Sequence, residues 1–531
     1  MRLERLAGRI MLLWGWRRAV LAIAAGAVAA LAMPPLNFIV ALFVSFPVLV
    51  WLLDGTAGSA NGGGLRRFAS AFFLGWCFGF GYFTAGLWWL GNALLLEADE
   101  FAWALPLATL GLPAVLAVYY GLAALVARLL WSDGAGRIGA LAIGFGLAEW
   151  LRAFLLTGFP WNAIGYGLMP VPVMMQQVAI VGLHGMTVFT VLVCAAPALF
   201  GTGKGLKTGV GLAVLLLVAQ FGYGGWSLSQ PAAEGGKRVN VRLVQPAIDQ
   251  SEKLEGGDRA AIFKEHLRLS ALPPAEGRPR PDIIVWPETS IPFILTENTD
   301  ALAAIADMLD DGQILVTGAV RVEAAAAGYP PRYYNSVYVI DSSGQILAAS
   351  DKVHLTPFGE YVPMEGVLRE FGIDNMIALP GGFTAASRRS LLALPNGPAL
   401  YPLICYEIIF PDEMDGLGDG TNGLLNVTND AWFGLTPGPW QHFQQARIRA
   451  VETGLPLIRA ANNGISAVVD EKGRIIEGLA LGAKGKVDAT VDMKVGPTPL
   501  SKWRKNNFWL IILTVLFYAV FARERFVSRK N

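Results

Sequence analysis

Long apolar runs alternate with short polar loops over the first part of the chain, and the pattern then changes. Seven runs precede residue 228, and an eighth lies near the C-terminus. They cover roughly 18–33, 36–53, 68–94, 103–130, 138–156, 176–200, 208–227 and 508–522. A membrane-spanning helix needs about 20 mostly apolar residues. The pattern therefore predicts a polytopic α-helical membrane domain of about eight spans, seven within residues 1–227 and the eighth, with a tail, within 506–531.

The short loops differ in charge, and this difference predicts the orientation. Lys and Arg gather at both chain ends and in loops 54–67, 131–137 and 201–207. Neither occurs in the alternate loops, which are 34–35, 95–102 and 157–175. Short basic loops stay in the cytoplasm, so we expect a multi-pass protein of the cell inner membrane with both termini cytoplasmic and residues 228–505 periplasmic. One observation argues against this orientation, because three basic residues adjoin the last run on its predicted periplasmic side: Lys502, Arg504 and Lys505. However, the charges of long translocated domains have little influence on orientation.

The composition agrees with a membrane protein. Of 531 residues, 54% are hydrophobic and only 16% are charged, whereas soluble proteins carry roughly 25% charged residues. The 42 Lys and Arg balance 41 Asp and Glu, which leaves no basic field to bind nucleic acid. Three cysteines cannot build a disulfide framework, and the four histidines show no metal-ligand spacing. No metal or organic cofactor is expected.

One pair of charges lies inside an apolar run. Glu149 and Arg152 are three residues apart in the fifth run. An unpaired charge in a membrane is costly, so the two side chains are expected to pair or to face a cavity. A structural ion pair near the interface and a role at a lipid headgroup both fit the sequence.

Between residues 228 and 505 the pattern becomes that of a soluble α/β domain. Short runs rich in β-branched residues predict strands at 238–245, 282–288, 313–320, 335–341, 400–407 and 423–430. Amphipathic stretches predict helices at 258–272 and 442–454. Apolar strands separated by helices imply sheets that helices cover. The pattern suits a four-layer αββα sandwich.

Polar residues near the ends of these strands are the candidates for chemistry. Glu288 follows a buried-type strand and Pro287, Lys352 lies in the segment SDKVHLTPFGEYVP, and Cys405 ends the run PLIC. Taken singly, each has a plainer explanation, since a lone cysteine is more often a small buried hydrophobe than a nucleophile. Cys405 is nevertheless the only cysteine outside the apolar runs.

The combination of these segments is far more specific than any one of them. WPE, then DKxHLxPFGEYVP, then CYE, followed by NDAWF at 429–433, resembles the nitrilase superfamily of Glu-Lys-Cys enzymes. With the apolar runs and the segment TGFPWNAIGYGL at 157–168, nearly the whole chain resembles the bacterial apolipoprotein N-acyltransferase family, the membrane-embedded branch of that superfamily. One position departs from the family pattern, because Leu254 stands where a Trp is often found. One aromatic contact to substrate is therefore in question.

The resemblance implies a nitrilase-like αββα fold and three catalytic roles. Glu288 would be the general base, Cys405 the nucleophile, and Lys352 the cation that faces the tetrahedral oxyanion. Further residues are expected to support the site or to contact substrate, namely Glu360, Tyr406, Glu407 and Trp432. A loop-stabilising ion pair is the alternative for Glu360, and core packing is the alternative for Trp432.

The same three residue types suit acyl transfer on chemical grounds. Transfer from an ester to an amine is easiest in two steps through a thioester. An unassisted cysteine has a pKa of about 8.5, so Cys405 needs a base. Burial at a strand end would raise the basicity of Glu288. A Lys352 cation, with backbone N–H groups near Cys405, would stabilise the oxyanion.

The resemblance also implies the substrates. The donor would be a phospholipid, usually phosphatidylethanolamine, and the acceptor the free α-amine of the S-diacylglyceryl cysteine that begins an apolipoprotein. Two alternatives stay open: a membrane-tethered amidase or nitrilase that hydrolyses a C–N bond, and a transporter or scaffold whose triad is inert. The triad cannot exclude a hydrolase, whereas the scarcity of polar residues in the apolar runs argues against a transporter.

Overall fold

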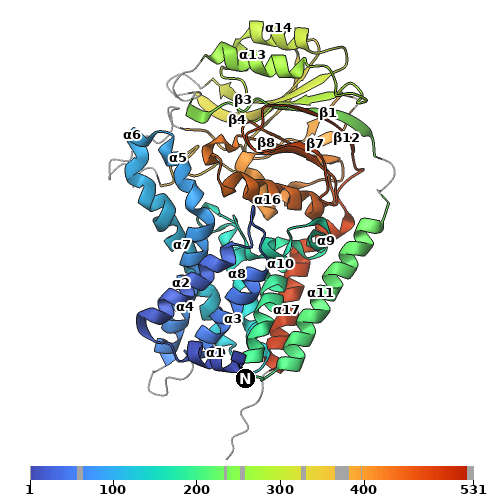
Figure 1. Ribbon diagram of the computed structural model, residues 1–531. Helices are drawn as coiled ribbons and strands as arrows, with labels where there is room; N and C mark the ends of the chain where they lie inside the picture. Colours follow the sequence, from blue (N-terminus) through green and yellow to red (C-terminus); the bar gives the residue numbers. More distant parts are fainter. Residues whose placement is uncertain are drawn as a thin grey trace, which may run out of the picture. The chain divides into compact units, whose positions relative to one another are not determined.

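The chain forms two compact units, one helical and one that contains all the described strands (Figure 1). The helical unit joins Met1–Pro231 to Pro499–Asn531, and the α/β unit is Ala232–Thr498. The computed structural model describes residues 2–56, 64–231, 236–251, 258–324, 331–364, 382–395 and 397–522.

Each of the eight apolar runs forms a helix. These helices are α2 (Gly15–Ala30), α3 (Val40–Asp54), α4 (Gly64–Leu87), α7 (Leu112–Leu129), α8 (Gly136–Arg152), α10 (Val178–Ala195), α11 (Leu206–Ser229) and α17 (Arg504–Phe521). Within the described residues, however, only four helical stretches are long and apolar enough to cross a membrane, or five if α1 (Arg2–Met11) and α2 form one bent span. The predicted count of eight spans is therefore not confirmed.

Three helices account for most of the difference. Helix α3 is apolar but only 15 residues long. Helix α8 carries Arg137, Glu149 and Arg152 and is 17 residues long, and α17 begins with Arg504 and Lys505. Most of α8 is nevertheless buried among other helices, so it need not be apolar enough to face lipid on every side.

Short helices connect the long ones. They are α5 (Gly91–Leu95), α6 (Ala98–Phe101), α9 (Pro172–Met175), η1 (Trp88–Leu90), η2 (Ala102–Ala104), η3 (Leu107–Gly111), η4 (Leu155–Thr157), η5 (Ile164–Leu168), η6 (Ala196–Gly201) and η11 (Pro499–Trp503). Every residue of η5 is buried, although it belongs to a connection between two predicted spans. This connection is therefore part of the packed unit rather than a surface loop.

The charged pair of α8 holds that connection in place. Glu149 and Arg152 are 1% and 0% exposed and form an ion pair. The Tyr120 hydroxyl donates a hydrogen bond to Glu149 at 2.6 Å. Arg152 donates to the carbonyl oxygens of Phe159 and Trp161, the latter at 2.9 Å. The structure thus favours a structural ion pair over a role at a lipid headgroup.

Glycines allow α2 and α4 to pack backbone against backbone. A Cβ atom added to Gly26 would collide with the carbonyl oxygen of Phe78, and one added to Gly81 would collide with that of Ile23. Close approach at small residues is how apolar helices gain packing energy in a lipid environment, where the hydrophobic effect does not drive them together. These glycines therefore fix the contact between the two helices.

The α/β unit is built on two sheets. In the described residues each sheet has six strands, in the orders β12-β1-β2-β3-β4-β5 and β11-β10-β9-β8-β7-β6. The strands are β1 (Arg238–Gln245), β2 (Ile283–Val285), β3 (Ile314–Glu323), β4 (Arg332–Asp341), β5 (Ile346–Asp351), β6 (Leu392–Ala393), β7 (Ala399–Ile404), β8 (Gly423–Thr428), β9 (Leu457–Ala461), β10 (Ser466–Val469), β11 (Ile475–Leu479) and β12 (Gly485–Asp492). The strands β1–β3 are parallel, as are β7–β9, and the outer strands are antiparallel.

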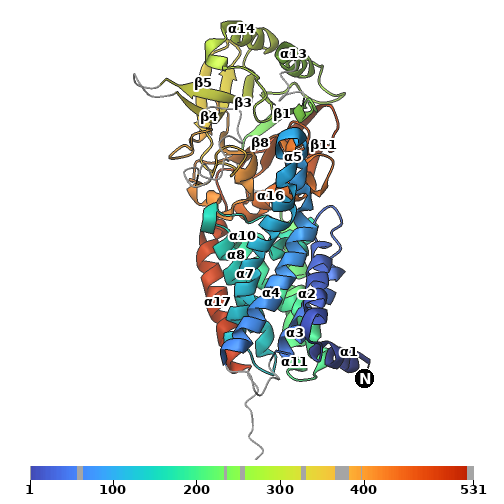
Figure 2. The ribbon, with the colours of Figure 1, turned by 90° about the vertical axis from the view of Figure 1, so that its left-hand side faces the viewer.

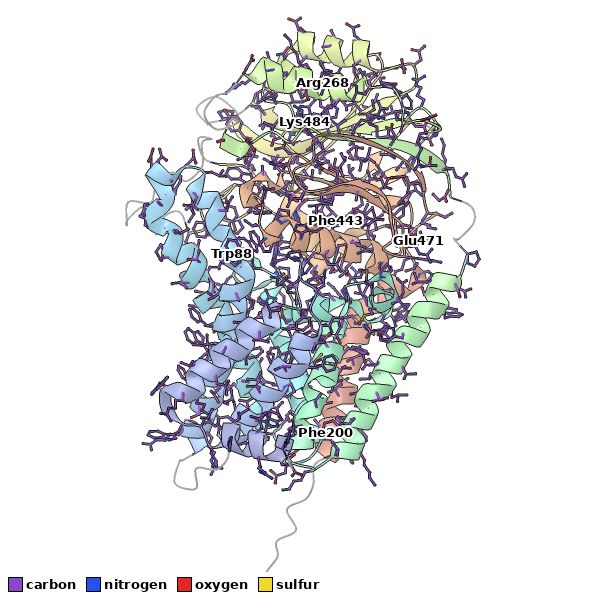
Figure 3. The ribbon with its side chains drawn as sticks, in the orientation of Figure 1. Trp88, Phe200, Arg268, Phe443, Glu471 and Lys484 are labelled. Carbon is purple, nitrogen blue, oxygen red and sulfur yellow. The ribbon has the colours of Figure 1, made fainter. Side chains whose placement is uncertain are left out.

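Helices cover the outer faces of both sheets (Figures 1 and 2). Between the sheets, Val285 of the first and Val427 of the second belong to one buried core. Helices α13 (Arg259–Ser270) and α14 (Thr299–Met308) cover the first sheet, where Phe263 packs near Trp286. Phe443 of α16 (Pro437–Thr453) is buried on the side of the second sheet (Figure 3). The predicted sandwich of two sheets between helices is confirmed.

Three predicted strands run past the observed C-terminal ends, and the one expected at 423–430 is β8, which ends at Thr428. The strand expected at 282–288 is only β2, since Pro287 has no N–H to continue a ladder. The strand expected at 400–407 ends at Ile404, where the chain enters the 3₁₀-helix η8 (Cys405–Ile409). Six strands were not predicted, namely β5, β6, β9, β10, β11 and β12. In β9 the buried Arg459 interrupts the apolar pattern.

Candidate active site

Glu288 lies just beyond β2 and receives hydrogen bonds from both sheets. Asn335 of β4 donates its side-chain N–H to Oε1 at 2.7 Å. The backbone N–H of Asn429, just after β8, donates to Oε2 at 2.9 Å. The carboxyl group is almost fully buried. Two donors on different sheets therefore hold Glu288 in one orientation at the interior edge of the sandwich.

Lys352 follows β5 and stands between two carboxylates. Its Nζ lies 2.8 Å from Glu360 Oε2 and 3.6 Å from Glu288 Oε1, and the side chain is 1% exposed. Asn335 bridges the same two carboxylates, with 2.8 Å to Glu360 Oε1. Glu360 also accepts the backbone N–H of Thr356 at 2.7 Å. Glu360 is thus both an ion-pair partner and a member of the cluster around Lys352.

Cys405 opens the turn that follows β7. Its φ of +50° lies in the left-handed region, which costs a non-glycine residue roughly 1–3 kcal/mol and occurs often at functional sites. The thiol interacts with the Glu288 carboxyl group and with the Thr428 hydroxyl. The structure therefore brings the three predicted residues together, from β2, β5 and β7, in one buried cluster.

The electrostatics of this cluster suit proton transfer. Burial raises the pKa of Glu288, while Lys352 partly offsets that effect. Burial, followed by the Glu288 carboxylate, raises the pKa of the Cys405 thiol. Burial opposes the Lys352 charge, but Glu360 and Glu288 outweigh it and raise the pKa of the ammonium group. At neutral pH the thiol is therefore protonated, the nearby carboxylate is a stronger base than usual, and the ammonium group stays charged.

Glu407 ties the lysine segment to the cysteine turn. One carboxylate oxygen accepts the backbone N–H of Val353 at 2.8 Å and that of His354 at 3.0 Å. The other accepts the N–H of Ile404 at 2.7 Å. Arg389 lies 2.7 Å from the first oxygen and neutralises this buried carboxylate. These hydrogen bonds agree with the predicted supporting role of Glu407, since they hold the residues next to Lys352 at a fixed distance from the residue next to Cys405.

Four buried residues near the Cys405 turn were not predicted as site residues. His442 of α16 lies with Nδ1 2.8 Å from Asp430 Oδ1 and with Nε2 3.2 Å from the Cys405 carbonyl oxygen. Arg459 of β9 pairs with Asp430 Oδ2 at 2.7 Å. Burial alone would raise the pKa of Asp430, but Arg459 and His442 lower it to about 2. Asn426 completes the network, since it accepts from Arg459 and donates to the Leu403 carbonyl oxygen at 2.7 Å.

The spacing of these residues explains why they were missed. Asp430 lies in the NDAWF segment, but no motif joins it to His442 or Arg459, because the fold brings together elements that are separated in the sequence. The available signals were charged residues in otherwise apolar elements, such as Arg459 within Leu-Ile-Arg-Ala-Ala. A charge in a buried strand needs a partner, and the nearest acidic residue after the preceding parallel strand is Asp430.

Two further predicted residues lie around the cluster. Tyr406 is buried, and its ring packs 4.9 Å from that of Phe410 and 5.9 Å from that of His354. Trp432 lies in the 3₁₀-helix η10 (Asp430–Phe433) and is partly exposed, so it is not simply a core residue. The departure from the family pattern at Leu254 lies outside the described residues. In the part of the chain that the structure describes, no group of three or more His, Cys, Asp or Glu could hold a metal ion.

The two-sheet sandwich with its buried Glu, Lys and Cys belongs to the carbon-nitrogen hydrolase class, whose family model matches residues 240–499. Residues 25–196 match the model described as the apolipoprotein N-acyltransferase N-terminal domain. The apolipoprotein N-acyltransferase of Agrobacterium fabrum is 64% identical over 529 residues, and that of Allorhizobium ampelinum is 62% identical, each with 100% of both chains covered. The chain belongs to the apolipoprotein N-acyltransferase family.

Among solved structures, an amidase from Nesterenkonia sp. is 18% identical to this chain. The match covers 52% of this chain and 97% of the amidase, with a TM-score of 0.34.

Proposed function

We propose that this enzyme transfers a fatty acyl chain from a phospholipid to the α-amine of the S-diacylglyceryl cysteine at the start of an apolipoprotein. The observation that carries the proposal is the buried cluster of Glu288, Lys352 and Cys405 in a chain that matches the family from end to end. Phosphatidylethanolamine is the proposed donor. The products are a lysophospholipid and an N-acylated, triacylated lipoprotein.

In the first half-reaction, Cys405 attacks the carbonyl carbon of the phospholipid ester. Glu288 takes the thiol proton as the sulfur–carbon bond forms, which is the role of a general base with a raised pKa. The tetrahedral oxyanion is stabilised by Lys352, whose charge is permanent. Collapse breaks the ester C–O bond, Glu288 returns the proton to the leaving alkoxide, and a thioester remains on Cys405.

In the second half-reaction Glu288 and Lys352 keep their roles, and Cys405 becomes the leaving group. The lipoprotein amine attacks the thioester carbonyl and gives a proton to Glu288. Lys352 again stabilises the oxyanion. Collapse breaks the C–S bond, the Cys405 sulfur regains a proton from Glu288, and an amide is formed. Glu360, Glu407 and Tyr406 are the proposed supports of this geometry, and Trp432 the proposed substrate contact.

The helical unit accounts for access to lipid substrates. We place the membrane domain at residues 1–227, the catalytic domain at 228–505 on the periplasmic side, and the last span and cytoplasmic tail at 506–531. The alternation of basic and non-basic short loops supports this arrangement. An enzyme held at the membrane meets the ester of a phospholipid at the lipid–water boundary, which turns a search in solution into local positioning.

Incubation of the purified chain with acyl-labelled phospholipid, first alone and then with a diacylated lipopeptide, tests the proposal. We expect a Cys405 thioester and lysophospholipid without the peptide, and label on the peptide amine after its addition. Release of free fatty acid or cleavage of an amide instead would identify a hydrolase. The absence of any acyl-enzyme would leave a transporter or scaffold with an inert triad.

A further inference from the structure

Helix α1 differs from the long helices of its unit in length, charge and direction. It has 10 residues, or about 15 Å of helix, which is half of a hydrocarbon core. Its axis is bent by 120° from that of α2. In Figures 1 and 2 it lies across one end of the helical unit rather than along it. These features do not fit half of a broken span.

The residues of α1 divide into two faces. At 100° per residue, Leu3, Leu6, Ala7 and Ile10 share one side, and three arginines share the other. The arginines are Arg2, Arg5 and Arg9. Ala7 and Ile10 are buried in the unit, and Ala7 would contact a Cβ placed on Gly201 of η6. The basic face is exposed.

An exposed aromatic and aliphatic segment continues from α1 into α2. Leu12, Trp14 and Trp16 are 80%, 83% and 72% exposed, and Phe200 of η6, labelled in Figure 3, is exposed at the same end of the unit. The guanidinium of Arg17 lies 5.7 Å from the centre of the Trp16 ring. Tryptophan and arginine together are typical of the headgroup level of a bilayer, where one part of a side chain is wet and the other apolar.

The charge of this end of the unit is strongly positive. Residues 2–18 contain five arginines and only one glutamate. The acidic residues of the neighbouring loops already have cationic partners: Asp54 pairs with Arg137 at 2.9 Å, and Asp133 with Lys204 at 2.9 Å. The complement of such a surface is a layer of anionic headgroups.

We infer that α1 and residues 12–18 form an interfacial anchor that lies in the plane of the membrane and binds anionic phospholipid headgroups. This inference rests on the proposed membrane topology, which makes this end of the unit cytoplasmic. The apolar face of α1 enters the boundary between headgroups and acyl chains, and its arginines contact phosphates.

Depth measurements on the full chain in nanodiscs test the position of α1. Nitroxide labels are placed at Leu3→Cys and Leu12→Cys in a Cys405→Ala background, since the other two cysteines are buried. References are Val118→Cys, on the exposed side of α7, and Leu391→Cys, in the α/β unit. Accessibility to oxygen and to a water-soluble nickel chelate should place both α1 labels between the references. Labels as deep as the one at Val118 would mean a broken span, and labels as wet as the one at Leu391 would mean a helix in water; either result overturns the inference.

A lipid-retention experiment tests the headgroup preference. Wild type and Arg2/Arg5/Arg9→Gln are purified from equal mixtures of phosphatidylglycerol and phosphatidylcholine, and the retained lipid is analysed. The matched control carries the same charge change on exposed arginines of the α/β unit, Arg238/Arg268/Arg280→Gln. The ratio of phosphatidylglycerol to phosphatidylcholine should fall at least about fivefold in the α1 variant alone, since one basic residue near an anionic surface is worth about that factor.

An unchanged ratio would refute the anionic preference. Acyl transfer is assayed in the same preparations after the proposed donor, phosphatidylethanolamine, and a diacylated lipopeptide are added. If wild type transfers no acyl chain, the proposed function fails while the depth and lipid results still decide the role of α1.

Discussion

The protein buries a cluster of charges in each of its two units, and the two clusters differ in balance. In the helical unit, Glu149 and Arg152 are one anion and one cation, and both make additional hydrogen bonds to fixed partners. In the α/β unit, Glu288 and Glu360 share the single cation of Lys352 beside the Cys405 thiol. In the first cluster the two charges balance, whereas the second cluster has two carboxylates and only one cation.

This difference in charge balance indicates that the first cluster stabilises the fold and that the second cluster is suited to proton transfer. A balanced buried pair has no reason to exchange protons, and its loss costs mainly stability. An excess carboxylate in a low dielectric has a raised pKa and gains by taking a proton from a neighbour. The comparison therefore predicts that changes in the second cluster alter the reaction, while changes in the first alter the fold. The predictions below run from the largest to the smallest expected effect on thioester formation.

Cys405→Ser should abolish the thioester, because the proposed nucleophile is lost. Cys77→Ala and Cys194→Ala should retain it, since both thiols are buried in the helical unit. Mass spectrometry of each variant after mixing with phospholipid measures the acyl adduct. A thioester on Cys77 or Cys194 would transfer the chemistry to the helical unit and break the comparison.

Glu288→Gln and Lys352→Met should each slow thioester formation by about 10²-fold or more, the usual loss when a general base or an oxyanion donor is removed. Gln keeps the shape of Glu288 and cannot accept the proton, and Met keeps most of the bulk of Lys352 without its charge. Rapid-quench measurements with phospholipid alone give the rate. A normal rate in Glu288→Gln would exclude Glu288 as the base and leave Glu360 or Glu407 to be tested.

The rate should also fall as the pH is lowered. The proposed base, Glu288, can take a proton only when it is ionised, and burial raises its pKa. Activity should therefore be present above that pKa and be lost about tenfold per pH unit below it. Lys352 stays charged throughout, because its pKa is raised. The pH dependence of thioester formation from phospholipid alone provides the measurement. A rate that stays constant down to the ordinary pKa of a glutamate would contradict a base of raised basicity.

The sequence predicted some parts of this site much better than others. Glu288, Lys352 and Cys405 could be named because each lies in a motif whose order is specific, and the structure brings them together. Asn335 and His442 could not be named, because their contacts depend on which strands and helices become neighbours. The long apolar helices were equally clear from the pattern, whereas the turn at Cys405 was hidden, since an apolar run does not reveal a change from strand to positive φ.

Arg389→Gln should slow thioester formation less, by roughly tenfold, because Arg389 acts through Glu407. Without the cation, a buried carboxylate that aligns the residues beside Lys352 and Cys405 loses its charge partner. Arg389→Lys should recover much of the rate. The rate at which iodoacetamide alkylates Cys405 provides the control, because that reaction forms no oxyanion. If Arg389→Gln only misaligns Lys352 with Cys405, alkylation should be slowed less than acylation. Equal losses in alkylation and acylation would mean general damage instead.

Glu149→Gln should leave thioester formation per folded molecule within about twofold of wild type and should instead destabilise the helical unit. The amide keeps an acceptor for the Tyr120 hydroxyl but leaves Arg152 buried without an anion, and removal of one partner from a buried pair costs about 3–5 kcal/mol. Thermal unfolding in detergent, measured together with the acylation rate of the same sample, reports both effects.

The double variant Glu149→Gln/Arg152→Met removes the unpaired charge and should recover part of the stability, although the hydrogen bonds of Arg152 to the Phe159 and Trp161 carbonyl oxygens are lost. If Glu149→Gln slowed acylation as strongly as Glu288→Gln without a change in stability, the balanced pair would have a part in the chemistry, and charge balance would no longer distinguish the two clusters.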